Sequence, residues 1–183
     1  MPWTFPTISV VCEVLRRQSV VATLVCIVVG CARGTEGSGF QMSQGALSPT
    51  ATVTYEFHDS SVPPKFHRSF VLSFTREQAR IVVDSYGDIL ADQAAPMTAA
   101  VWDEVSQSFA DLSDIVIEEP EQGCTGGTAF AVSVADGGMT SFSLHGSACG
   151  GANSRAEERL QNWVRPVRVL FPPMDQLAPE GNR

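Results

Sequence analysis

Lysine is almost missing from this chain: Lys65 is the only one among 12 basic residues, which stand against 20 acidic ones. Charged residues make up 17% of the 183 positions, and the formal net charge is −8. A phosphate backbone is bound by clustered cations, so this balance argues against nucleic acid as a partner. Hydrophobic residues reach 44%, which favours a folded chain over a disordered one, and the length suits one domain.

Catalytic and metal-binding motifs are also missing. The chain has no Gly-x-Ser-x-Gly elbow, no HExxH or EF-hand pattern and no CxxC pair, and no Gly-Lys-Ser/Thr follows its glycine-rich stretches. We therefore predict no catalytic residue, no metal site and no cofactor. Two weaker alternatives stay open. A metal site would need tertiary convergence of His58, Asp59, His67 and His145. Weak calcium binding would use Glu118, Glu119 and Glu121, which otherwise form a solvated acidic loop.

The most specific pattern lies near the N-terminus. Residues 19–30, SVVATLVCIVVG, form an apolar run directly after Arg16 and Arg17. A spanning helix needs about 20 apolar residues, so this shorter run favours a secretion signal. Its end, Val28-Val29-Gly30-Cys31, resembles the lipobox of bacterial lipoproteins. The resemblance implies cleavage before Cys31, a diacylglycerol thioether on that thiol, and anchoring to the extracytoplasmic side of the cell membrane.

This resemblance sets the predicted organisation of the chain. Residues 1–30 are the signal peptide, with a true start near residue 14, because residues 1–15 hold two prolines and an acid. The Gly/Ser/Thr-rich stretch 31–50 reads as a flexible tether. Residues 51–171 form the folded domain, and 172–183 form a loose Pro-rich tail.

Two cysteines remain for the folded domain. Cys12 and Cys26 fall in the signal and Cys31 is the lipidation site, which leaves Cys124 and Cys149. In an exported protein an even pair predicts a disulfide, and closing a loop of about 25 residues stabilises by roughly 3–4 kcal/mol in the chain-entropy model. Free thiols and a metal site are the alternatives.

Alternating apolar residues predict strands over 52–57, 69–75 and 79–86. Pro96 ends this extended region, and Thr98 caps a helix over 98–112. The acidic stretch 113–127 then reads as a long loop.

Two further strands, 128–135 and 139–145, flank the hairpin signal Asp136-Gly137-Gly138. Ser154 and Glu157 form a capping box for a second helix, which Pro166 should end or kink near Arg165. The order β-β-β-α-β-β-α predicts an α+β domain. Its antiparallel sheet of about five strands is covered by two amphipathic helices.

The connection over 58–68 is the candidate binding loop. The predicted binding residues in it are His58, Asp59, Ser60, Pro63, Pro64, Phe66, His67 and Arg68. The adjacent prolines favour a rigid loop that is either purely structural or binds a partner. A hydrolase would instead use His58 or His67 as a base for Ser60 or Ser61.

Together these features predict an exported, lipid-anchored envelope protein whose domain is a non-catalytic binding or accessory module for an unknown protein or envelope partner. The order of elements loosely resembles that of emfourin-type inhibitors of metalloproteases. That resemblance implies protease inhibition as the alternative, and a hydrolase or a purely structural assembly factor are further alternatives.

Overall fold

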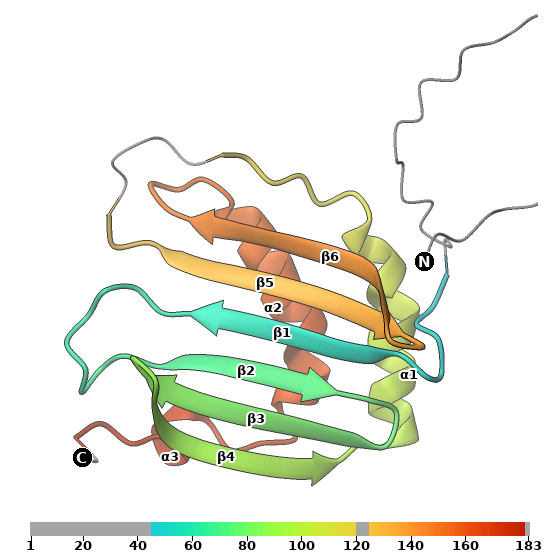
Figure 1. Cartoon of the computed structure of the whole chain (residues 1–183), viewed down its shortest axis with the longest axis horizontal. Coiled ribbons are helices and arrows are strands. Elements are labelled where there is room, and N and C mark those ends of the chain that lie inside the picture. The colour runs from blue at the N-terminus through green and yellow to red at the C-terminus, as the bar shows by residue number, and fades with distance from the viewer. Residues whose placement is uncertain (1–44, 120–124, 182–183) are drawn as a thin grey trace, which may run out of the picture. The chain divides into compact units, whose positions relative to one another are not determined.

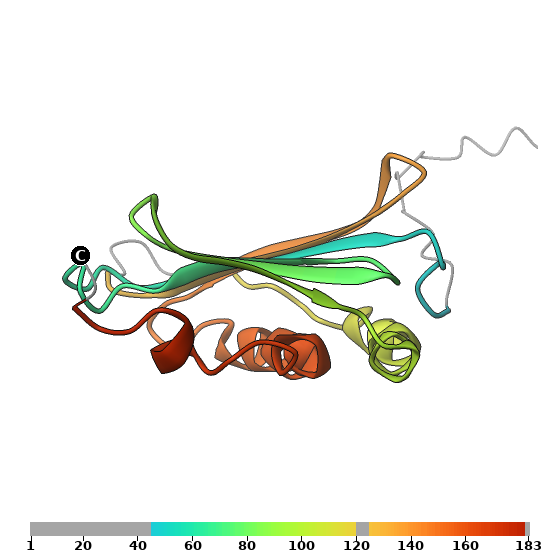
Figure 2. The same cartoon turned by 90° about the horizontal axis from the view of Figure 1, so that it is seen from below.

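The computed structural model describes residues 45–119 and 125–181, which form one sheet with helices on one side (Figures 1 and 2). The elements in chain order are β1 (Thr52–His58), β2 (Ser69–Phe74), β3 (Gln78–Ser85), β4 (Asp88–Pro96), α1 (Ala99–Gln107), the 3-10 helix η1 (Ser108–Leu112), β5 (Thr128–Asp136), β6 (Met139–Ala148), α2 (Ser154–Arg168) and α3 (Met174–Leu177). The predicted α+β class with an antiparallel sheet is confirmed.

The sheet places its first strand in the middle. Within the described residues it has six antiparallel strands in the order β4-β3-β2-β1-β5-β6. Tyr55 of β1 lies between Leu72 of β2 and Val132 of β5. The strands β4 and β6 are therefore the two edges of the sheet.

The core lies between the sheet and its helices. Every second strand residue turns toward that side, as the fully buried Val53, Leu72 and Ile81 show. Removing a side chain of this size from water contributes about 1.5–3 kcal/mol. Helix α2 is amphipathic, as predicted, and one stripe of its side chains is buried. The buried members of that stripe are Ala156, Leu160, Trp163, Val164 and Val167.

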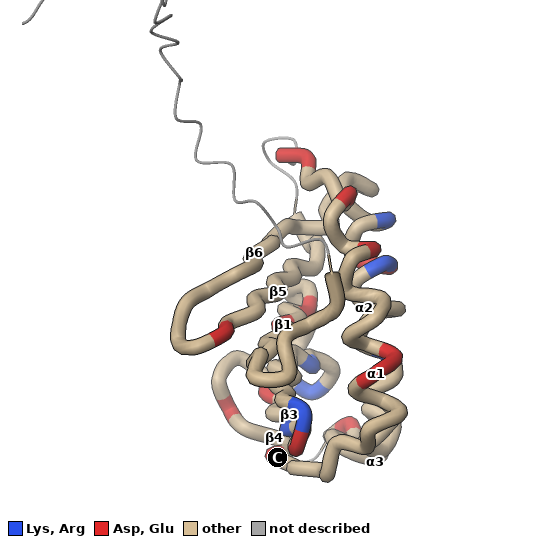
Figure 3. The backbone as a smooth tube through the Cα atoms, turned by 90° about the vertical axis from the view of Figure 1, so that its right-hand side faces the viewer, with Lys and Arg blue, Asp and Glu red and all other residues tan. Residues whose placement is uncertain are grey.

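The opposite face of the sheet carries small and polar side chains. One row runs across all six strands through Ala94, Arg80, Ser73, Thr54, Ser133 and Ser143. Arg80 forms a bidentate pair with Asp92 on this face, with Nε–Oδ1 and Nη2–Oδ2 distances of 2.8 and 2.5 Å. Figure 3 shows these opposite charges near β3 and β4, whereas β6 carries no Lys, Arg, Asp or Glu.

The strand β4 is absent from the predicted set of about five and is the main correction to the fold. It pairs with β3 through a turn in which Tyr86 and Gly87 have φ values of 53° and 92°. Two successive residues in the left-handed backbone conformation give a turn whose twist matches that of the flanking strands. The sequence pattern missed β4 because it is an edge strand without clean alternation, and its acids Asp88 and Asp92 face water.

The first helix is confirmed in position and shorter in extent. The Oγ1 atom of Thr98 accepts a hydrogen bond from the Val101 amide at 3.3 Å, as expected of an N-cap. The α-helix ends at Gln107, and the rest of the predicted 98–112 range is the 3-10 helix η1.

The capping box predicted for the second helix is wrong. The N-cap of α2 is Asn153, in a left-handed conformation with φ of 58°. The Ser154 hydroxyl donates to the Gly151 carbonyl instead. The Glu157 carboxylate accepts from the Thr128 hydroxyl at 2.8 Å, so it ties α2 to β5 rather than closing its own first turn.

Pro166 also does not end that helix, which continues to Arg168. A proline inside a helix loses one backbone hydrogen bond and crowds the preceding turn. Val167, which comes after the proline, is completely buried. Burial of this side chain against the sheet favours continuation of the helix.

Both ends of the domain reach further than predicted. Leu47, in the expected tether, is buried, and its amide donates to the Ser106 carbonyl. The expected loose tail contains α3, whose Leu177 is also buried. None of the helices over 45–119 and 125–181 is long and apolar enough to cross a membrane.

Candidate functional site

The connection between β1 and β2 is closed at its base by one carboxylate. The Oδ1 atom of Asp59 accepts from the Ser60 amide at 2.8 Å, and its Oδ2 accepts from the Arg68 amide at 2.9 Å. The Asp59 amide itself donates to the Ser69 hydroxyl at 3.0 Å. The two ends of the loop are thus held together by the side chain that begins it, and the Asx-type geometry fixes its path.

Arg68 fastens the loop to the C-terminal region. Its Nε donates to the Ala178 carbonyl at 2.8 Å and its Nη2 to the Pro179 carbonyl at 2.9 Å. The same guanidinium also donates to the carbonyls of His67 and Lys65 inside the loop. Charged donors make stronger hydrogen bonds than neutral ones, so Arg68 rigidifies two segments more than 100 residues apart.

His67 is buried under the loop and is a packing residue. Its ring stacks on Tyr86 with centroids 3.9 Å apart, and its Nε2 lies 3.3 Å from the Ser69 hydroxyl oxygen. Its Nδ1 is buried and reaches no hydrogen-bond partner among the described residues.

The turn between β3 and β4 braces the proline-rich part of the loop. Ser85 donates its hydroxyl to the Pro64 carbonyl at 2.8 Å, and the Tyr86 hydroxyl donates to the Val62 carbonyl at 2.6 Å. Sequence reasoning missed Ser85 and Tyr86 because it did not find the hairpin that brings them there. The Tyr-Gly pair before an extended segment is the signal that could have located that turn.

The braced loop holds its apolar tip in water. The Phe66 side chain is 43% exposed, and the Lys65 ammonium lies 4.6 Å from the centre of its ring. Pro63 and Pro64 are exposed beside it, and Tyr86 is 55% exposed. These residues form an exposed surface with two aromatic rings and one cation, Lys65. The hydrogen bonds described above fix the shape of this surface.

The histidines and serines of the hydrolase alternative are not brought together. The Nε2 of His58 lies 3.4 Å from a Glu56 carboxylate oxygen, while His67 is directed into the stack with Tyr86. The Ser60 hydroxyl lies 3.5 Å from Asp59. No hydrogen bond joins either histidine to Ser60 or Ser61 in the part of the chain that the structure describes.

The metal alternative likewise lacks an assembled ligand set. Over residues 45–119 and 125–181, no group of three or more His, Cys, Asp or Glu side chains is arranged to hold a metal ion. Glu121, a member of the acidic loop, lies outside the described residues.

The predicted cysteine chemistry falls largely on undescribed positions. Cys31 and the whole signal segment lie outside the described residues, and so does Cys124. Cys149 directly follows β6 and is buried. A Cβ added to Gly127 would lie 2.7 Å from the Cys149 Cβ, so position 127 lies close against this cysteine. The Cys124–Cys149 disulfide stays a prediction.

Three kinds of comparison bear on family membership. Protein-family models, curated proteins and solved structures were each compared with the chain, and none of them matches it.

Proposed function

We propose that this protein is an exported lipoprotein whose folded domain is a non-catalytic binding module, with the 58–68 loop as its binding surface. The observation that carries the proposal is the loop's internal bracing. Asp59, Arg68 and Tyr86 fix the loop through hydrogen bonds, while Phe66 is left exposed at its tip. A loop already ordered before binding loses little conformational entropy on binding, so it suits recognition.

The place of the loop in the fold supports the same proposal. Strand β1 runs from the end of the sheet where residue 45 enters the domain to the end where the 58–68 loop lies (Figure 1). A strand of seven residues spans about 20 Å or more. The loop therefore lies at the end of the sheet opposite the end where residue 45 enters the domain.

The lipid anchor on Cys31 and the Cys124–Cys149 disulfide belong to this proposal. The anchor is supported by the sequence Val28-Val29-Gly30-Cys31 after a short apolar run. The disulfide is supported by the position of Gly127, three residues after Cys124, against the buried Cys149. The intact mass of the natively expressed protein tests both. We expect residues 31–183 plus acyl groups, with an increase of about two daltons on reduction. An unmodified full-length mass would refute the anchor, and an unchanged mass on reduction would refute the disulfide.

The binding role of the loop is tested by placing a photoreactive phenylalanine analogue at position 66. Val169 is the matched control position, since it is 70% exposed and lies just after α2 rather than in the loop. We expect a discrete crosslinked product from position 66 in intact cells and none from position 169. The product should disappear when Arg68→Ala releases the loop from Ala178. Equal crosslinking from both positions, or none from position 66, would contradict the proposal.

A further inference from the structure

The edge strand β6 leaves part of its backbone without a strand partner. The Ser147 carbonyl accepts a hydrogen bond from Asn153 Nδ2 at 3.0 Å, so it points away from β5. Backbone groups in an antiparallel pair alternate in direction, and Ser143 and His145 therefore also turn their N–H and C=O groups to the open side. Among the described residues, Asn153 supplies the only hydrogen bond that reaches a β6 backbone group from outside the ladder with β5.

A trough runs along this open edge. A hollow of about 530 Å³ borders residues 140–144. Another of about 760 Å³ borders residues 143–147 and continues past residues 129–131 of β5 to His58 of β1. Both are lined by Ser143 and Leu144, so they adjoin along the strand. The other wall is the 112–119 segment, which contributes its apolar side chains. Those side chains are Leu112, Ile115 and Ile117.

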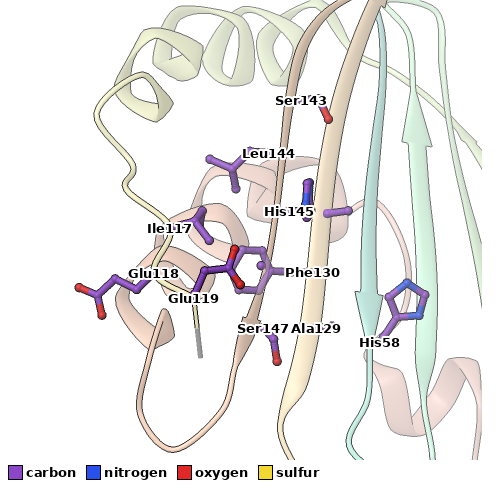
Figure 4. A pocket seen from close by; sticks show the side chains of 12 residues that line it. His58, Ile117, Glu118, Glu119, Ala129, Phe130, Ser143, Leu144, His145 and Ser147 are labelled. Carbon is purple, nitrogen blue, oxygen red and sulfur yellow. The ribbon is translucent and has the colours of Figure 1, made fainter. Parts of the chain in front are cut away.

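The trough is acidic at one end. The 112–119 segment runs in the same direction as β6, since Leu112 lies near Thr140 and Glu118 near Ser147. In Figure 4, Ile117 and Leu144 line one hollow, with Glu119 directed toward β6 and Glu118 directed away from it. The trough is thus acidic beside the C-terminal end of β6 and apolar along its middle.

We propose that this trough binds an extended segment of a partner polypeptide, which adds to β6 as an antiparallel strand. Free edge groups pair with another backbone, and the alternate pockets select its side chains. The bound segment carries apolar residues at alternate positions, packed between Phe142, Leu144 and Ile115. It carries a basic residue near its N-terminus, because an antiparallel strand begins at the end where Glu119 lies.

A second copy of this chain is a poorer occupant than a single extended segment. Figure 1 shows the 112–119 segment running alongside β6 beyond the edge of the sheet. A symmetric β6–β6 pair would bring two such segments into the same space. The larger hollow also borders His58, the first residue of the 58–68 loop, so this surface adjoins that loop. The tests below change no residue of the loop, so their outcome is separate from that of the tests of the loop.

The test uses the full chain and a labelled synthetic peptide of one lysine followed by alternating valine and threonine, eight residues in all. We expect a rise in fluorescence anisotropy with a Kd of roughly 10–100 µM, and at least about tenfold weaker binding when two threonines are replaced by proline. Absence of binding by the first peptide, or equal binding by both, would overturn the proposal.

Two matched proline variants locate the contact. Ser143→Pro removes an outward N–H from β6, and Ala94→Pro makes the corresponding change on β4, at the other end of the same cross-strand row. Edge strands tolerate proline where the N–H faces solvent, so both variants should keep their circular dichroism spectra. Only Ser143→Pro should abolish peptide binding. Equal loss in both, or in neither, would contradict binding at β6.

The orientation is tested through charge. Glu119→Gln should weaken the lysine peptide about two- to fivefold, and moving the lysine to the other end of the peptide should have a similar effect on the unaltered protein. Increased affinity in either experiment would refute the antiparallel arrangement. The oligomeric state is measured by analytical ultracentrifugation. A dimer of the unaltered protein that is absent in Ser143→Pro would overturn the proposal and indicate self-association through β6.

Discussion

The two edges of the sheet differ in what discourages pairing with another strand. Strand β4 carries Asp88 and Asp92, ends at Pro96, and has a register shift opposite Val83 and Asp84. Acidic side chains, proline and bulges all discourage pairing with another strand. Strand β6 is ten residues long and has neither a charged residue nor a proline. What lies beside β6 is a separate part of the chain, the 112–119 segment.

The difference teaches that β4 is protected from pairing by its own sequence, whereas β6 keeps outward backbone groups and is bordered by a segment that tertiary contacts hold in place. The contacts at β6 come from α2. Asn153 at its N-cap bonds to Glu118 and Ser147, and Arg159 bonds to Asp114 and to the Asp111 carbonyl. Substitutions beside β6 should therefore reduce stability more than comparable substitutions beside β4.

The largest effect is expected at Asn153. Its Oδ1 accepts from the Glu118 amide at 2.8 Å, and its Nδ2 donates to the carbonyls of Glu118 and Ser147 at 2.7 and 3.0 Å. Asn153→Ala leaves these backbone groups without their partner and places alanine at positive φ. We expect a loss of about 3 kcal/mol in the free energy of unfolding, measured by urea denaturation.

Asn153→Gly separates the two causes. Glycine removes the same hydrogen bonds and adopts positive φ readily, so its loss should be smaller by about 1 kcal/mol. In both variants, hydrogen exchange should become faster in residues 113–119 and in β6, with β4 unchanged. Unchanged exchange in residues 113–119 would show that Asn153 does not hold this segment.

The next effect is expected at Gly146 on the helix side of β6. A Cβ there would lie 2.7 Å from Phe130 Cζ and 3.3 Å from Ile117 Cγ2. Phe130 is buried and cannot move freely. Gly146→Ala should therefore lower the free energy of unfolding by about 2 kcal/mol through overpacking. A loss below about 0.5 kcal/mol would show that the ring and the 112–119 segment adjust readily.

A smaller effect is expected at Gly87 in the turn before β4. Nothing lies within 4 Å of a Cβ added there, but its φ is 92°. Gly87→Ala should cost about 1 kcal/mol through backbone strain alone. Gly87→Asn is the control, because asparagine tolerates left-handed φ better than alanine and should cost less. If Gly87→Ala lowered the free energy of unfolding more than Gly146→Ala does, the contrast between the two edges would be contradicted.

The same contrast explains what the sequence could predict. The strands β1, β2, β3 and β5 alternate because one face of each is buried, and a pattern of period two carries that information. In β6 the same pattern separates half-buried Phe142 and Leu144 from exposed Ser143 and His145. Strand β4 lacks this alternation, because most of its residues, both acids included, are exposed. The capping box failed because Glu157 has a better partner in Thr128, far away in sequence.

Only some features of the candidate loop could be predicted from the sequence. Its approximate range and its proline rigidity follow from local sequence, although His58 is the last residue of β1 rather than part of the loop. Its bracing does not, because Arg68 reaches Ala178 and Pro179, and Tyr86 comes from a hairpin two strands away. Contacts between distant segments depend on strand order, and no residue pattern in the loop encodes that order.

The smallest effects concern the two surface ion pairs, one near each edge. The Arg80 guanidinium, through its hydrogen bonds, holds the pKa of Asp92 below its usual range, and Arg159 does the same for Asp114. A folded-state pKa below the unfolded value gives stability that is present at neutral pH and lost as the pH falls through the folded value. Thermal melts of the unaltered protein, Asp92→Asn and Asp114→Asn should therefore differ at pH 7, and the difference should shrink as the pH falls below about 4.

Of these two, Asp92→Asn should lower the melting temperature more at pH 7. Arg80 and Asp92 form a bidentate pair that has no substitute, whereas Arg159 keeps its bond to the Asp111 carbonyl after Asp114 is neutralised. At this position β4 is the more sensitive edge, because the Asp92 carboxylate lies on β4 itself, whereas the ion pair near β6 joins α2 to the 112–119 segment. Salt should reduce the Asp92→Asn difference and leave the Gly146→Ala difference unchanged, since packing is not screened. A salt-dependent Gly146→Ala effect would show that charge also acts at β6.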